Sequence, residues 1–352
     1  MNKVYQAESS VTAAPSAGHI NINLSVDQYE HITEVSIRNE RPKNLGNILI
    51  GLEPEQALQR IPTVFLLCSQ AQQCAAYGAM LSVQGQEMMP EQFRQSYEGC
   101  ALEWLKEHSW QLWQMEREQF GEDFAMHDSI ALSRELLTQL RHYPKFTLQH
   151  NPAEKPTETD WTRVQELLTP LFGITPAHFL SFSISDLKKW SQSQAPYARL
   201  LDAMLDNSVS RLGTYEQWDI SHESGSISRQ KHPLLDHALE HWGNGLLTRT
   251  LARLIEMASV CQHPELASPE KPGQAKASRG SLQHSVEINA QGIIFRYDID
   301  APTDRYFCDG GIVEQSLLGQ KLPELTWVRQ LIWAIDPCVE FTVTSHAHNK
   351  EN

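Results

Sequence analysis

The sequence lacks the features that would carry it out of the cell or into a membrane. Its first residues, MNKVYQAESSVTAAPSAG, contain no apolar segment of the kind that a secretory signal needs. No uninterrupted apolar run approaches the roughly 18 to 20 residues of a membrane span. We therefore expect a cytoplasmic protein with no membrane span.

Positive charge is also scarce. The 352 residues include 29 Lys and Arg against 43 Asp and Glu, which gives a formal net charge of −14. Because proteins bind the phosphate backbone through clustered Lys and Arg, this balance argues against nucleic acid as a main partner.

A further absence is that of any Cys-x-x-Cys pair. In AIDPCVEF, near the end of the sequence, Cys338 is followed three residues later by Phe341, where a second thiol would complete a metal clamp. Without an export signal, structural disulfides are not expected, so each cysteine is either a small buried hydrophobe or a working thiol. The six cysteines are Cys68, Cys74, Cys100, Cys261, Cys308 and Cys338.

Alternating apolar residues are present near both ends of the sequence, and they predict strands. Residues 20–26 alternate Ile, Leu and Val with polar residues, and residues 33–37 alternate again, as an antiparallel partner would. Residues 286–297 surround Gly292 in the pattern of a hairpin.

The middle of the sequence has a helical pattern instead. From about residue 90 to 260, apolar residues recur at three- and four-residue steps, which predicts a bundle, and the stripe from Leu234 to Ile255 predicts one long helix. A Pro-rich linker over residues 263–278 follows. A short helix is expected after Pro54, leading into a buried apolar run around Cys68.

These patterns together predict an α+β fold. A central helical bundle is expected, with the β elements from both chain ends packed together. Its three regions are residues 1–88, 89–262 and 263–352, and they form one integrated domain. No repeat with a fixed period is present.

Two thiols at opposite ends of this layout are candidates for chemistry. Cys68 and Cys338 meet in space if the terminal β regions pack together. Two thiolates from separate segments can bind a soft metal such as iron, nickel or zinc. Two ligands alone make an open, weak site, so such a metal needs non-protein ligands or a partner's side chain. From the residues alone, a metal site and two buried thiols both remain open.

A resemblance to a known family bears on this choice. The run KASRGSLQHSVEINAQGIIFRYDIDAPT at 276–303 resembles a segment of nickel-iron hydrogenase large subunits, in which RG-x-L-x-H is followed by G-x-I, Y and PT. The stretch VRQLIWAIDPC at 328–338 is similar to that family's ending, and GHINI at 18–22 to its opening strand. The resemblance implies the fold of a hydrogenase large subunit.

The departures from this family concern the metal ligands. In the enzymes four cysteines hold the metals, whereas here the pairs read Phe65-x-x-Cys68 and Cys338-x-x-Phe341. The resemblance aligns Cys68 with a bridging cysteine and Cys338 with a cysteine that binds nickel terminally. Because a phenyl ring cannot coordinate either metal, no stable nickel is expected.

Three further departures indicate that hydrogen turnover is lost. Gln72 stands where the family has a histidine after its first cysteine pair, and Ala17 stands where it has a proton-relay glutamate. A methyl group cannot transfer a proton. Thr344 stands where a histidine precedes the family's maturation site. We therefore expect neither hydrogenase activity nor processing of a C-terminal tail.

A shortened chain with these losses resembles the hydrogenase accessory proteins of the HupK/HoxV type. That resemblance implies a scaffold for an iron fragment that carries cyanide and carbonyl ligands, Fe(CN)2(CO), held transiently by Cys68 and Cys338. It also implies partners: a maturation chaperone of the HypC type, an iron-assembly protein of the HypD type, and the apo large subunit.

Other residues near these motifs have two interpretations each. The resemblance implies that Arg279 donates to a cyanide nitrogen, whereas a surface arginine capping a turn is the alternative. Asp336 either orients a neighbouring group or caps the local turn, and Gln72 is a further candidate for binding the fragment. Cys308 is a candidate for a third ligand. His346 and the nearby His348 form either a nickel-binding pair or a solvated tail.

Two other functions remain open. One is an active metalloenzyme with an altered mononuclear site. The other is a metal-free mimic of the large subunit that binds maturation chaperones.

Overall fold

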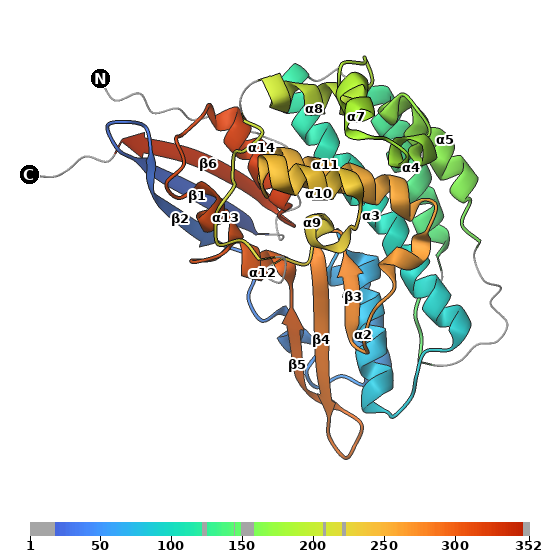
Figure 1. The fold of residues 1–352 in the computed structure, drawn as a ribbon. Coiled ribbons are helices and arrows are strands. Elements are labelled where there is room, and N and C mark those ends of the chain that lie inside the picture. The colour runs from blue at the N-terminus through green and yellow to red at the C-terminus, as the bar shows by residue number, and fades with distance from the viewer. Residues whose placement is uncertain are drawn as a thin grey trace, which may run out of the picture.

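Strands from the two ends of the sequence lie side by side in the computed structural model, which describes residues 18–121, 125–143, 145–148, 158–206, 209–219 and 223–347. β1 (His19–Val26) pairs antiparallel with β2 (Ile32–Asn39) and parallel with β6 (Glu340–Ala347), in the order β2-β1-β6 (Figure 1). Ile20 lies opposite Phe341. The predicted packing of both chain ends is confirmed.

A second sheet is antiparallel and has the order β3-β4-β5. Its strands are β3 (Gln274–Ala277), β4 (Gly280–Ile288) and β5 (Ile294–Asp300), so the predicted hairpin is confirmed. The prediction of a linker over residues 263–278 was wrong in part. This stretch contains the short helix η3 (Pro264–Ala267) and β3, because Ala275 and Ala277 are buried against the core.

Helices form most of the described chain outside the two sheets (Figure 1). The predicted single helix over 234–255 is two helices, because the chain turns at Gly243, whose φ of +72° suits glycine and strains other residues. The helices are η1 (Leu45–Leu49), α1 (Pro54–Val64), α2 (Ser69–Val83), α3 (Pro90–Phe120), α4 (Met126–His142), α5 (Trp161–Phe172), α6 (Pro176–Leu180), α7 (Ile184–Ser191), α8 (Pro196–Asp206), α9 (Ser226–Arg229), α10 (Pro233–Trp242), α11 (Leu246–Val260), α12 (Pro302–Tyr306), α13 (Ile312–Leu317) and α14 (Leu325–Ile335).

The main core joins the helical bundle to the terminal sheet, and a smaller core lies between α1, α2 and β5. Between residues 71 and 81, α2 is buried throughout, and its small side chains let it pack closely on β3 and β4. The apolar run before it was predicted to be buried, but Leu66 is 68% exposed and Leu67 is 44% exposed. The run is a loop between α1 and α2, and Leu66 and Leu67 line a pocket instead of packing in the core. Among the described helices, none is long and apolar enough to cross a membrane.

Candidate functional site

Cys68 and Cys338 line one pocket, whose volume is about 320 Å³. Cys68 lies directly before α2, and Cys338 lies between α14 and β6. The fold therefore brings together two thiols from opposite ends of the sequence. Most of the wall is apolar, and its polar side chains include those of Arg279 and Gln72. The other lining residues are Arg41, Pro42, Leu45, Thr63, Val64, Phe65, Leu66, Leu67, Ala277, Leu282, Ala301, Pro302, Thr303 and Val339.

The first turn of α2, which carries Cys68, is anchored to α3. The Glu103 carboxylate of α3 accepts hydrogen bonds from the backbone N–H groups of Gln70, at 2.8 Å, and Ala71, at 3.2 Å. Helix N-termini leave such N–H groups without intrahelical partners, so this carboxylate acts as a cap. Burial raises the pKa of Glu103 to about 7, although the Lys106 cation opposes the shift.

The thiol of Cys68 is held in its protonated form. Burial raises its pKa to about 12, and the negative charge of Glu103 adds to the shift, whereas the Arg279 guanidinium opposes it. The neighbouring Cys338 also contributes to the raised pKa of Cys68. Because a metal binds the thiolate, a metal that enters the pocket must displace a proton from Cys68.

Arg279 is only 5% exposed, so the alternative of a surface arginine is wrong. Its Nη2 donates to Glu107 Oε2 at 2.7 Å, and its Nε lies 3.3 Å from Asp336 Oδ1. A guanidinium has five N–H groups, and the contact of Nη1 with the Ser278 hydroxyl is long, at 3.4 Å. Arg279 therefore retains donor capacity for a ligand in the pocket.

Asp336 lies at the end of α14 and pairs with the side chain of Arg279. It ends α14 in a left-handed conformation, with φ of +73°, and it lies two residues before Cys338. Its Oδ1 accepts a hydrogen bond from Gln111 Nε2 at 2.9 Å, and its carboxylate pairs with Arg279 and with Arg253, the latter at 3.5 Å. It does not line the pocket of the two thiols.

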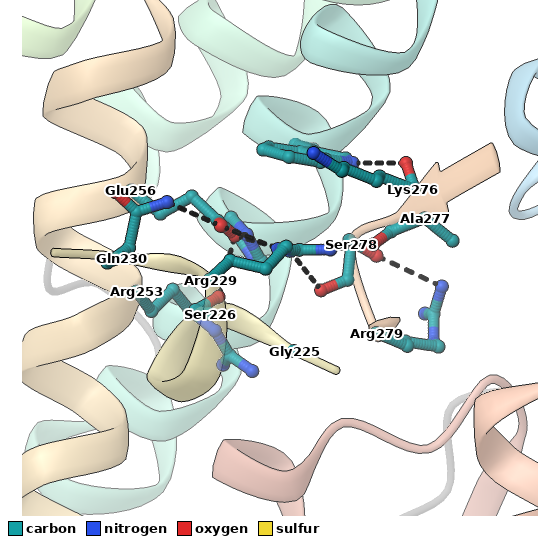
Figure 2. A network of polar contacts seen from close by, with 12 residues as sticks. Gly225, Ser226, Arg229, Gln230, Arg253, Glu256, Lys276, Ala277, Ser278 and Arg279 are labelled. Atoms are coloured by element: carbon teal, nitrogen blue, oxygen red, sulfur yellow. Dashed lines mark hydrogen bonds and ion pairs between the residues drawn. The ribbon is translucent and has the colours of Figure 1, made fainter. Parts of the chain in front are cut away.

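The turn that carries Arg279 is held by a network of polar contacts, which Figure 2 shows. Arg229 donates to the backbone carbonyls of Ala277, at 2.5 Å, and Ser278, at 3.0 Å, and it pairs with Glu256 of α11. Glu256 also accepts from Ser226 and lies 2.7 Å from His108 Nε2. Although burial alone favours the neutral acid, Arg229 and His108 hold the pKa of Glu256 well below its usual value.

The two phenylalanines that replace thiols lie in different surroundings. Phe65 lines the pocket beside Cys68. Phe341 does not line it and packs instead against Trp333 in the main core. The two losses are therefore not equivalent in the fold.

Several candidates lie apart from the two thiols. Cys308 is exposed and lines a neighbouring cavity of about 480 Å³, which shares Phe65 and Gln72 with the thiol pocket. His346 is exposed on β6, and Thr344 on the same strand donates to Asn23. His348 and Ala17 fall outside the described residues. The other three cysteines, Cys74, Cys100 and Cys261, are buried.

Within the described part of the chain, no group of three or more His, Cys, Asp and Glu side chains is arranged to hold a metal ion. Sequence reasoning missed Glu103, Glu107 and Glu256, which support the pocket from buried helix positions. A signal was present for the first two: they lie on α3 one turn apart, among the apolar residues that predict its buried face.

Comparison with known proteins identifies relatives along nearly the whole chain, although no family model matches it. The chain is 27% identical to the hydrogenase expression/formation protein HupV of Azotobacter chroococcum mcd 1, over 93% of this chain and 98% of that protein. It is 26% identical to the hydrogenase expression/formation protein HupK of Azotobacter vinelandii, over the same shares. It is 25% identical to HupK of Bradyrhizobium diazoefficiens, over 89% and 92%. The resemblance to accessory proteins of this type is confirmed.

Solved structures that match the fold of this chain include two hydrogenases. An NAD+-reducing [NiFe]-hydrogenase in the H2-reduced state matches with a TM-score of 0.58 and 14% identity, over 89% of this chain and 94% of that one. The Ni-Fe-Se hydrogenase of D. vulgaris Hildenborough matches with a TM-score of 0.54 and 14% identity, over 88% and 94%. The chain has the fold of a nickel-iron hydrogenase large subunit, as predicted.

Proposed function

We propose that the chain is a non-catalytic scaffold or carrier for the Fe(CN)2(CO) fragment during maturation of a nickel-iron hydrogenase. The relatives, which are named hydrogenase expression/formation proteins, support a role in maturation. The proposal that the cargo is this iron fragment is based on the pocket that Cys68 and Cys338 share.

The donor set of the pocket suits such a cargo. Thiolate sulfur is a soft, polarisable donor that binds iron. Two sulfurs and three diatomic ligands give iron five donors, which is enough for a defined complex. Because each additional thiolate raises the barrier to handing the fragment on, two sulfurs favour release over permanent binding.

The charge of the pocket suits it as well. Two thiolates and two cyanides carry four negative charges against the two positive charges of ferrous iron, so the bound fragment is anionic. The buried guanidinium of Arg279 lines the same pocket and offsets part of this charge. Its free N–H capacity suits a hydrogen bond to a cyanide nitrogen.

The proposal includes partners and excludes turnover. The fragment comes from a HypC-type chaperone and a HypD-type iron-assembly protein, and it passes to the apo large subunit. Phe65 and Phe341 leave one thiol in each segment, so no stable nickel is held and hydrogen is not turned over. These exchanges take place in the cytoplasm.

Infrared spectroscopy of protein purified without oxygen from a maturation-competent host tests the proposal. We expect cyanide and carbonyl stretching bands in the wild type and their loss in Cys68→Ser and in Cys338→Ser. Cys308→Ser is the matched control, because this thiol lies outside the pocket, and it should keep the bands.

Two results would overturn the proposal. The first result is that the wild type shows no infrared bands and that maturation proceeds equally well with the wild type and with the double variant Cys68→Ser, Cys338→Ser. This result indicates a metal-free mimic of the large subunit. Hydrogen uptake with a dye acceptor indicates an altered metalloenzyme.

A further inference from the structure

A chain of hydrogen bonds runs from the second sheet to the sulfur of Cys68. The Tyr297 hydroxyl of β5 lies 2.7 Å from Nδ1 of His284 on β4, and Nε2 of His284 lies 2.8 Å from Oε1 of Gln72 on α2. Nε2 of Gln72 then donates to Cys68 Sγ at 3.6 Å. The side chains of Gln72, His284 and Tyr297 are all buried.

We propose that His284 and Tyr297 are positioning residues that orient the Gln72 amide so that it donates an N–H to Cys68 when that sulfur binds iron. The inference rests on the proposed function, which makes Cys68 a ligand of iron. It adds His284 and Tyr297, neither of which lines the pocket of the two thiols.

The direction of each bond follows from the metal-bound sulfur. A coordinated thiolate has no proton, so it can only accept, and Gln72 must present its amide nitrogen. The amide oxygen then faces His284, which must donate from Nε2. A neutral imidazole carries one proton, so Nδ1 must accept from the Tyr297 hydroxyl. Burial lowers the pKa of His284 to about 3 and raises that of Tyr297, which agrees with a neutral ring and a protonated phenol.

The chain makes the two sulfurs inequivalent. An N–H donor withdraws electron density from a thiolate, so Cys68 gives less density to iron than it would without Gln72. No described residue donates a hydrogen bond to the sulfur of Cys338 within bonding distance. When the chain is broken, Cys68 becomes the stronger donor, and the iron returns more density to the carbonyl ligand.

Tyr297→Phe is the sharpest test, because it removes one oxygen atom and keeps the ring in its place. In iron-loaded protein we expect the carbonyl band to move to lower wavenumber while its intensity is retained. Tyr77→Phe is the matched control, since Tyr77 belongs to the same small core but not to the chain, and its band should coincide with that of the wild type. A merely structural role of Tyr297 predicts lost intensity without a shift. A Tyr297→Phe band at the wild-type position would overturn the proposal.

A second measurement separates this inference from the proposed function. Mercury(II) binds two thiolates without any iron fragment. In mercury-loaded protein, histidine-selective nitrogen NMR should find the proton of His284 on Nε2, with the signal identified by its absence in His284→Gln. A proton on Nδ1 would overturn the inference. If the wild type shows no iron bands but the proton lies on Nε2, the function fails and the hydrogen-bond chain stands.

Discussion

The rings of Trp333 and Phe341 pack edge to face, with their centroids 5.5 Å apart. Trp333 belongs to α14, and Phe341 is only 8% exposed on β6. Phe341 thus joins α14 to the terminal sheet, whereas Phe65 lines the thiol pocket. The two positions at which cysteine is missing therefore make different predictions when a thiol is introduced.

Phe341→Cys should destabilise the protein. The substitution removes most of a buried ring that contacts Trp333, and large-to-small changes of this kind in a core cost about 2 to 4 kcal/mol. The free energy of unfolding in urea measures the effect. Phe341→Leu, which keeps more of the volume, should lose less. Equal stability of Phe341→Cys and the wild type would contradict the assignment of Phe341 to the core.

Phe65→Cys should act on cargo rather than on stability. Phe65 is partly exposed, so we expect a loss of less than about 1 kcal/mol. A third thiol in the pocket should hold the iron fragment more tightly and slow its transfer to the apo large subunit. The decay of the infrared bands of the carrier measures the rate of this transfer. Phe65→Ser is the control, because serine has nearly the same size as cysteine and has no sulfur. Equal transfer rates in the two variants would refute the effect of the extra thiolate.

Asp336→Asn should weaken the support of Arg279. The Asp336 carboxylate lies 3.3 Å from Arg279 Nε and 3.5 Å from Arg253 Nη2, and all three side chains are buried. Removing the negative charge leaves a buried cation undercompensated, which costs about 3 kcal/mol. Asp309→Asn is the control, because Asp309 is exposed near the same end of the chain. A difference in unfolding free energy within the error of that control would show that the pairing contributes nothing.

Strands β1 and β2 and the meeting of the two thiols could be predicted because their signals are local, whereas β6, the third strand of the terminal sheet, was not predicted. Strands near both ends alternate with a period of two, and the motifs around Cys68 and Cys338 are short and ordered along the chain. The same period could have assigned Phe341, since it and Val343 are buried on β6 while Thr342 between them is only partly so. Phe65 has no such pattern, because it lies in a loop.

The supports of the pocket could not be predicted in the same way. Glu103 caps a helix to which it is not adjacent in sequence, and Glu256 of α11 contacts side chains from two other helices, α3 and α9. Their roles depend on which helix faces meet, which a single sequence does not specify. The turn at Gly243 was missed for the opposite reason, since the apolar stripe continues across it although the backbone does not.

The buried carboxyl group of Glu116 gives a prediction about pH. Glu116 is fully buried on α3, and neither of its carboxyl oxygens has a hydrogen-bond partner among the described residues. Burial raises its pKa from 4.5 to about 8, against the opposing charge of Arg199. A carboxyl group whose pKa is raised in the folded state makes its full contribution to the free energy of unfolding at pH values below its pKa in the unfolded state. That contribution is lost as the pH rises through the folded pKa, at about 1.4 kcal/mol per unit.

Wild-type stability should therefore fall by several kcal/mol relative to Glu116→Gln between about pH 4.5 and pH 8, because the amide cannot ionise. Urea unfolding of both proteins at a series of pH values measures the difference, in which the titration of every other group cancels. Glu87→Gln, at an exposed position between α2 and α3, should track the wild type throughout. Parallel stability curves for wild type and Glu116→Gln over this range would mean that Glu116 is ionised in the folded protein, and that water or a bound cation reaches its carboxylate.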